Sequence, residues 1–204
     1  RRVLFRSVFK VGKEDVVSYD GTGISTPDLQ DWPTGLGAPT LDANGDLIDM
    51  LDQPLASRVD RVINLAAGER PAILGDQMLW WVMNDRGNQH TRTNTPAMGV
   101  EVHGTAFAFN TSGAIGNTTF YKYRIIYKGS VPLENTYMGL FSDPDLGNFD
   151  DDYVGSDTTL GLGFVYNADN DDEGGEGYGA APPAAGYDFF QGPLVNNQDR
   201  KSTR

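Results

Sequence analysis

Residues 143–157, DPDLGNFDDDYVGSD, gather the side chains of this sequence that are best suited to chemistry. The stretch contains Asp143, Asp145, Asp150, Asp151, Asp152 and Asp157. Carboxylates at this density suit three tasks: metal binding, acid–base catalysis by a carboxylate pair, or solvation of a surface loop. Carboxylates that lie close together repel one another unless a cation neutralises them. Calcium is the cation that we predict for this loop, because it takes six to eight oxygen ligands.

Two further loops have a similar composition. The first, DANGD, contains Asp42, Asn44 and Asp46, and the second, residues 167–177, contains Asp169 and Asp171. The first resembles the start of an EF-hand loop, but its glycine comes one position early and no glutamate closes it. Asp, Asn and Gly are also the ordinary residues of turns. Calcium binding and plain turn chemistry therefore both stay open for these loops.

Other catalytic or metal-binding patterns are missing from the sequence. It has no cysteine and only two histidines, His90 and His103, which are too few for a zinc site. Neither a phosphate-binding loop nor a Gly-x-Ser-x-Gly motif is present. His103 lies beside Glu101 in an expected strand and is expected to be a core or rim residue. We assign no catalytic residue and predict that the chain is not an enzyme, with a carboxylate-based hydrolase left as the open alternative.

The tryptophans provide a second kind of candidate site. Trp80 and Trp81 are adjacent, so they point to opposite faces of a strand, with one in the core and the other free for a surface role. Trp32 lies in a turn-rich loop. We take Trp32 and Trp81 as candidate residues for stacking against a sugar ring.

The elements that must position these residues read as β-strands separated by loops rich in Gly and Pro. The expected strands are 78–84, 99–110, 118–128, 136–143, 159–167 and 186–195. Residues 55–67 form either a short helix that ends at Gly68 or an extended segment, because the stretch is also rich in β-branched residues. In the strand at 159–167, Leu160, Leu162, Phe164 and Tyr166 are expected to point inward. The predicted class is all-β, an antiparallel β-sandwich of immunoglobulin-like or jelly-roll-like type with long acidic loops and an irregular N-terminal segment. Residues 143–157 form one of its inter-strand loops.

The two ends of the chain look foreign to the rest of the sequence. Residues 1–7 and 199–204 resemble a translated sequencing adapter in its two orientations, so we exclude both from the fold and expect an internal fragment. The predicted β-sandwich domain is 71–198, and 8–70 is an irregular segment or part of a preceding module. Without the six basic residues and one acidic residue of the ends, the 16 basic and 28 acidic side chains become 10 and 27, a net charge of −17. Such acidity argues against nucleic-acid binding and fits an exported protein or a binder of divalent cations.

Several segments together resemble part of a known group of proteins. They are GDQMLWWVMND, FYKYRIIYKG, YMGLFSDPDLGNFDDDYVGSDTTLGLGFVYN and PPAAGYDFFQGPLV. These segments are similar to a region of large exported proteins of Bacteroidetes-group bacteria, which typically end in a type IX secretion sorting domain. The resemblance implies an extracellular or outer-membrane surface location and a β-sandwich-rich architecture, with no established catalytic residues.

We therefore predict a non-catalytic structural or adhesive module of a secreted or cell-surface bacterial protein, with calcium-stabilised Asp-rich loops. The alternative is a carbohydrate-binding accessory domain of a secreted polysaccharide-degrading enzyme. Expected partners are neighbouring domains of the parent chain, glycans or surface proteins, and we expect neither nucleic-acid binding nor a membrane span.

Overall fold

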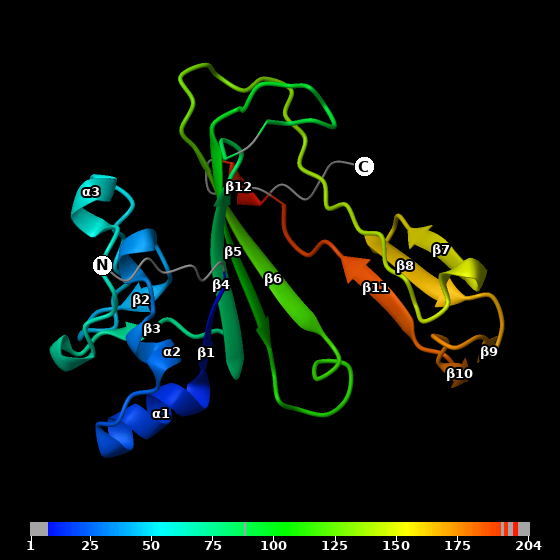
Figure 1. The fold of residues 1–204 in the computed structure, drawn as a ribbon, viewed down its shortest axis with the longest axis horizontal. Coiled ribbons are helices and arrows are strands. Elements are labelled where there is room, and N and C mark those ends of the chain that lie inside the picture. Colours follow the sequence, from blue (N-terminus) through cyan, green and yellow to red (C-terminus); the bar gives the residue numbers. More distant parts are fainter. Residues whose placement is uncertain (1–7, 88, 193, 196–197, 200–204) are drawn as a thin grey trace. The chain divides into compact units, whose positions relative to one another are not determined.

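The computed structural model describes residues 8–87, 89–192, 194–195 and 198–199 (Figure 1). The fold is mostly β-strand, and the sheets are antiparallel, as the sequence predicts. The chain divides into two compact units between Glu134 and Asn135. From the sequence, the expected domain boundary lies between residues 70 and 71. Of the two adapter-like ends, 1–7 and 200–204 lie outside the described residues.

The first unit is built on a four-stranded sheet. Its strands are β1 (Phe9–Gly12), β4 (Gln77–Asn84), β5 (Val100–Ala108) and β6 (Thr119–Tyr127), in the spatial order β1-β4-β5-β6. The three strands predicted at 78–84, 99–110 and 118–128 are thus confirmed. Adjacent residues of each strand point to opposite faces, so the pairing of Trp81 with Gly104, and of Gly104 with Tyr123, fixes which side chains share a face.

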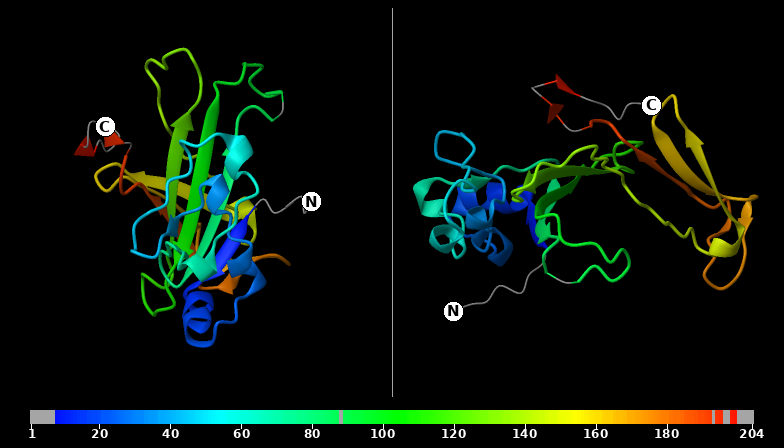
Figure 2. Two further views of the ribbon diagram at one scale, coloured as in Figure 1. Left: turned by 90° about the vertical axis from the view of Figure 1, so that its left-hand side faces the viewer. Right: turned by 90° about the horizontal axis from the view of Figure 1, so that it is seen from above.

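The N-terminal segment supplies short elements that cover one face of this sheet. They are α1 (Lys13–Thr22), α2 (Pro27–Gln30), η1 (Thr34–Leu36), β2 (Thr40–Leu41), α3 (Leu55–Arg58), η2 (Leu65–Ala67) and β3 (Arg70–Pro71), with β2 paired to β3. Figures 1 and 2 show these blue and cyan elements together on one side of the sheet. The hydrophobic core lies between the two layers and contains Leu29, Trp32, Met78 and Trp80. Residues 8–70 therefore contribute both an edge strand and most of the buried core residues of the first unit.

Two helices differ from the expectation. The sequence predicts a helix over 55–67, whereas the structure has a single α-turn at Leu55–Arg58 and a 3₁₀ turn at Leu65–Ala67. Gly68 ends that turn with φ of 86°, a left-handed conformation that favours glycine. Helix α1 was missed because none of its residues is buried, so it has no apolar periodicity to detect. Its start is stabilised by Asp15, whose carboxylate accepts a hydrogen bond from the backbone N–H of Gly12.

The second unit contains a three-stranded sheet in the order β11-β8-β7. The strands are β7 (Asp152–Asp157), β8 (Leu162–Asn167) and β11 (Ala184–Asp188). A 3₁₀ turn, η3 (Phe149–Asp151), precedes β7. Two small ribbons complete the described part of this unit: β9 (Asp171–Asp172) with β10 (Gly179–Ala180), and β12 (Leu194–Val195) with β13 (Gln198–Asp199).

Four predictions for this unit need correction. Residues 136–143 form no strand, and the C-terminal strand ends at Asp188 instead of continuing to 195. The stretch 143–157 is not one loop, because its last six residues form β7. In β8 the buried residues are Val165 and Asn167, whereas Tyr166 is exposed, so the predicted inward face is wrong. A sheet of three strands buries little surface, so an alternating pattern alone does not tell which face is covered.

Candidate functional site

The open face of the four-stranded sheet carries a continuous group of exposed aromatic and apolar side chains. We name this surface the aromatic face. It consists of Trp81, Met83, Tyr121, Tyr123, Ile125 and Tyr127. Tyr121 is 60% exposed and Tyr123 is 44% exposed, and Trp81 is half-buried. The residues of β4, β5 and β6 that point to this side include no charged side chain.

The rings of the aromatic face are in contact with one another. Trp81 meets Tyr123 edge to face at a centroid distance of 6.2 Å, and the planes of Tyr121 and Tyr123 are parallel to within 7° at 6.5 Å. Gly104 lies between the two strands that carry Trp81 and Tyr123, and a Cβ there would be only 2.2 Å from the indole ring. The indole thus lies over the backbone of Gly104. Burial raises the pKa of Tyr123, and its neighbour Tyr121 raises it further, so the Tyr123 phenol stays a neutral hydrogen-bonding group.

The two tryptophans proposed as surface ligands have different positions. Trp80 is buried in the core and Trp81 lies on the aromatic face, which confirms that the adjacent pair divides between the two sides of β4. Trp32 is fully buried, and its indole N–H donates to the carbonyl of Pro39 at 3.1 Å. The prediction that Trp32 stacks on a ligand is therefore wrong, because this residue fills the core between the N-terminal segment and the sheet.

His103 and Glu101 lie on the core side of β5 and form a hydrogen-bonded contact. His103 is buried, its ring meets Trp80 edge to face, and its Nε2 is 3.0 Å from Oε1 of Glu101. Lys128 donates to Oε2 of the same carboxylate at 2.6 Å. Burial acts to raise the pKa of Glu101, but the bonds from Lys128 and His103 outweigh it and lower that pKa. The position of His103 agrees with the expected core role.

The acidic stretch 143–157 is separated by the structure into exposed and half-buried carboxylates. Asp143, Asp145 and Asp150 are exposed, while Asp151 and Asp152 are half-buried. Oδ2 of Asp151 accepts a bond from the Asn167 side chain, and Oδ2 of Asp152 accepts one from the backbone of Leu146, both at 2.8 Å. The Oδ1 atoms of both aspartates are buried and make no hydrogen bond within the described residues.

Asp172 is the acidic residue that the sequence reasoning missed. It is fully buried, and its carboxylate accepts bonds from the backbone N–H groups of Asn148 at 3.1 Å and Tyr178 at 2.7 Å. Gly147, with φ of 65°, lies so close that a Cβ there would be 2.1 Å from Oδ2 of Asp172. Asp172 thus connects the stretch 143–157 with the loop 167–177. A lone aspartate within an acidic run gives no sequence signal of burial.

The remaining predicted ligands organise turns. Asp42 accepts bonds from the backbone of Asn44 at 2.8 Å and Asp46 at 3.0 Å, which lower its pKa, the bond from Asp46 having the larger effect. Asp157 accepts bonds from Thr159 and Leu160, and Oδ1 of Asp169 accepts one from the backbone of Asp171. These contacts are typical of Asx turns.

The described residues contain no group of three or more acidic or histidine side chains that could hold a metal ion. Among the predicted ligands, Asp151 and Asp152 are the ones that could still bind calcium. They are adjacent, and each has a buried carboxylate oxygen without a hydrogen bond. Calcium can complete its coordination with backbone carbonyls and water. Calcium binding by this chain stays a prediction.

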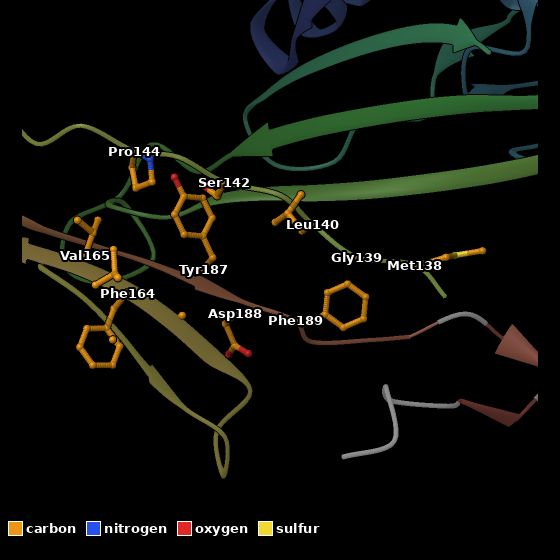
Figure 3. A pocket seen from close by; sticks show the side chains of 13 residues that line it. Met138, Gly139, Leu140, Ser142, Pro144, Phe164, Val165, Tyr187, Asp188 and Phe189 are labelled. Atoms are coloured by element: carbon orange, nitrogen blue, oxygen red, sulfur yellow. The ribbon is translucent and has the colours of Figure 1, made fainter. Parts of the chain in front are cut away.

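The second unit also has an open apolar pocket of about 420 Å³. Residues 138–144 pass over one face of the three-stranded sheet, and side chains of Leu140, Phe164, Val165, Tyr187 and Phe189 line the space between them (Figure 3). Asp188 is the single ionisable carboxylate among the lining residues. The pocket brings together none of the residues predicted as metal ligands.

Comparisons with protein-family models, with curated proteins and with solved structures gave no match. Within the described part of the chain, no helix has the length and apolar character needed to cross a membrane.

Proposed function

We propose that this chain is a non-catalytic adhesive module of a secreted or cell-surface bacterial protein, and that the aromatic face is its binding surface. The observation that carries the proposal is the contiguous, uncharged group formed by the half-buried Trp81 and the exposed Tyr121 and Tyr123. Exposed aromatic patches of this kind mark interaction sites, because they release water on binding while their polar tips still form hydrogen bonds. The acidity of the chain and the resemblance described above support the exported location.

A neutral carbohydrate is the second candidate for what the module binds. The Trp81 indole and the nearly parallel rings of Tyr121 and Tyr123 offer apolar surfaces to the faces of sugar rings, and the phenol hydroxyls can bond to sugar hydroxyls. An uncharged surface on an acidic chain disfavours anionic ligands. This would make the chain a carbohydrate-binding accessory domain.

A retention assay on coated surfaces tests both candidates. The full chain is bound to cellulose, chitin and xylan, and in parallel to collagen-coated and albumin-coated surfaces. Retention on polysaccharide that is lost in Trp81→Ala and Tyr123→Ala supports carbohydrate binding, whereas the same loss on protein supports protein adhesion. Tyr137→Ala is the matched control, because Tyr137 is 93% exposed and lies outside the aromatic face. Retention that neither face variant changes would contradict the proposal for this surface.

We retain calcium as a part of the proposal, with Asp151 and Asp152 as the residues that would bind it. The buried, unbonded Oδ1 atoms of these two adjacent aspartates support this assignment. The ion would neutralise two carboxylates at the point where η3 passes into β7, and so would stiffen that connection. The thermal-unfolding test of this site is given in the Discussion.

A further inference from the structure

The outer strand β6 is exposed on both of its faces. Seven of its nine residues are exposed, whereas its neighbour β5 has no exposed residue. The strand is also last in the order β1-β4-β5-β6, so one of its edges has no strand beside it within that sheet. Long exposed edge strands are templates for pairing with another chain, and proteins usually shorten or cover them.

The backbone groups that face this free edge follow from the hydrogen-bond pattern. Lys128 donates its backbone N–H to the carbonyl of Gly99, its partner in the ladder. Hydrogen-bonded and non-hydrogen-bonded pairs alternate along an antiparallel ladder, so the even-numbered residues of β6 bond to β5. The odd-numbered residues point their N–H and C=O groups away from β5. They include Tyr121, Tyr123 and Ile125.

The two faces of β6 have opposite character. One belongs to the aromatic face, and the other presents Lys122 and Arg124. Lys122 has no ion-pair partner among the described residues. Arg124 pairs with Asp49 at 2.9 Å, but both side chains are about half exposed, at 55% and 47%. Exposed ion pairs are weak, so a carboxylate on a partner can take the place of Asp49.

A second copy of this chain is a poor partner for that edge in the register that overlaps the two β6 strands completely, which is centred on Tyr123. Antiparallel pairing of two β6 strands around Tyr123 would place Lys122 of each copy directly opposite Arg124 of the other. Like charges directly opposite one another across a strand pair are destabilising. A strand whose charged residues are acidic would instead form two attractive pairs at the same positions.

We propose that β6 binds an extended acidic peptide segment of another protein by β-strand addition. The peptide alternates acidic residues, which face Lys122 and Arg124, with apolar residues, which continue the aromatic face. Main-chain bonds to the outward groups of Tyr121, Tyr123 and Ile125 supply the pairing, and the alternation supplies specificity. The site differs from that of the proposed function, because it is the edge of the sheet and not its open face.

Fluorescence anisotropy with the full chain and a labelled nine-residue peptide of alternating Glu and Val tests the proposal. Two control peptides have the same composition in blocks, or Lys in place of Glu. The binding of all three peptides is measured at about 0.15 M salt. At this salt concentration, negative charges of the chain that lie more than about 8 Å from the peptide are largely screened. The alternating acidic peptide is expected to bind about tenfold more tightly than either control, from a few cross-strand charge pairs and the matched pattern.

Two variants separate backbone pairing from side-chain effects. Ile125→Pro removes an outward N–H without touching the ladder to β5, and proline is tolerated at such edge positions. It is expected to weaken acidic-peptide binding about tenfold, and Ile125→Thr, which keeps the N–H and loses only apolar contact, is expected to weaken it less than Ile125→Pro does. Lys122→Glu is expected to abolish the preference for the Glu peptide over the Lys peptide, because the new carboxylate and Arg124 then give either peptide one attractive and one repulsive pair.

Three results would overturn the proposal. The block peptide could bind as well as the alternating one, which would mean that no strand is added. Ile125→Pro, folded as judged by its circular dichroism, could bind the acidic peptide with wild-type affinity. Finally, ultracentrifugation could reveal a dimer that Ile125→Pro dissociates, which would make a second copy the occupant of the edge.

Discussion

The indole of Trp81 lies directly over Gly104 on the neighbouring strand, where a Cβ would be 2.2 Å from the ring. This contact places the indole over the backbone of β5 and beside Tyr123, with which it makes its edge-to-face contact. The aromatic face therefore depends on a residue that contributes no side chain to it. Gly104 is buried within β5, so the indole must move if this position gains a side chain.

Gly104→Ala is expected to lower the free energy of unfolding by about 1–3 kcal/mol, because overpacking forces the indole from its place. Urea unfolding measures the change. Gly163→Ala is the matched control, since Gly163 also lies in a strand but a Cβ there meets nothing within 4 Å. An alanine at 104 that leaves stability and aromatic-face binding unchanged would show that the ring does not need this surface.

Asp172→Asn is expected to destabilise the second unit by about 1–3 kcal/mol, because the amide nitrogen cannot accept the bond that Asn148 or Tyr178 donates to the carboxylate. Thermal unfolding followed by circular dichroism measures the loss. Asp171→Asn, an exposed neighbour, serves as the control and should change stability by less than about 0.5 kcal/mol. Equal effects of the two substitutions would contradict the role assigned to the buried carboxylate.

The sequence predicted the class of the fold and three strands of the first sheet well, because β4, β5 and β6 have strong apolar or alternating patterns. It also divided Trp80 from Trp81 correctly, since adjacent residues of a strand must point to opposite faces. Whether a residue is covered by another element could not be predicted from the local sequence pattern. Trp32 looked like a loop residue, and its burial follows from contacts with Trp80, which is 48 positions away.

The acidic residues show the same difference between local and long-range information. That Asp42 and Asp157 organise turns follows from local sequence, because an aspartate bonds to the backbone two or three residues ahead. The burial of Asp172 depends on Asn148, 24 positions away, and no local pattern predicts it. The alternating positions of the tyrosines in β6 place them on one face of the strand, but their exposure depends on the strand being last in its sheet.

Calcium at millimolar concentration is expected to raise the unfolding temperature of the second unit. With a dissociation constant of about 1 mM, typical of extracellular calcium modules, 10 mM calcium stabilises by about 1.4 kcal/mol. This corresponds to a rise in the unfolding temperature of about 6–11 °C for a unit of this size. Differential scanning calorimetry with calcium, and with magnesium at equal ionic strength, measures it.

The matched variants for calcium are Asp151→Asn with Asp152→Asn, compared with Asp143→Asn and Asp145→Asn. The first pair should abolish the calcium-dependent rise, and the second pair, whose carboxylates are exposed, should retain it. A wild-type chain whose unfolding temperature does not change between zero and 10 mM calcium would remove the metal from the proposal.

Glu101→Gln is expected to make the stability of the first unit less dependent on pH. Burial raises the pKa of Glu101, but the hydrogen bonds from Lys128 and His103 bring it below its ordinary value of 4.5. A carboxylate whose pKa is lower in the folded chain stabilises the fold above the unfolded-state pKa, and this contribution is lost as the pH falls through the folded-state pKa. The free energy of unfolding of the wild type should thus exceed that of the variant by about 1–2 kcal/mol at pH 7, and the two values should converge near pH 3.

Urea unfolding at a series of pH values checks this, with the exposed Glu134→Gln as control. A difference that persists undiminished at pH 3 would mean that Glu101 acts through packing and not through its charge.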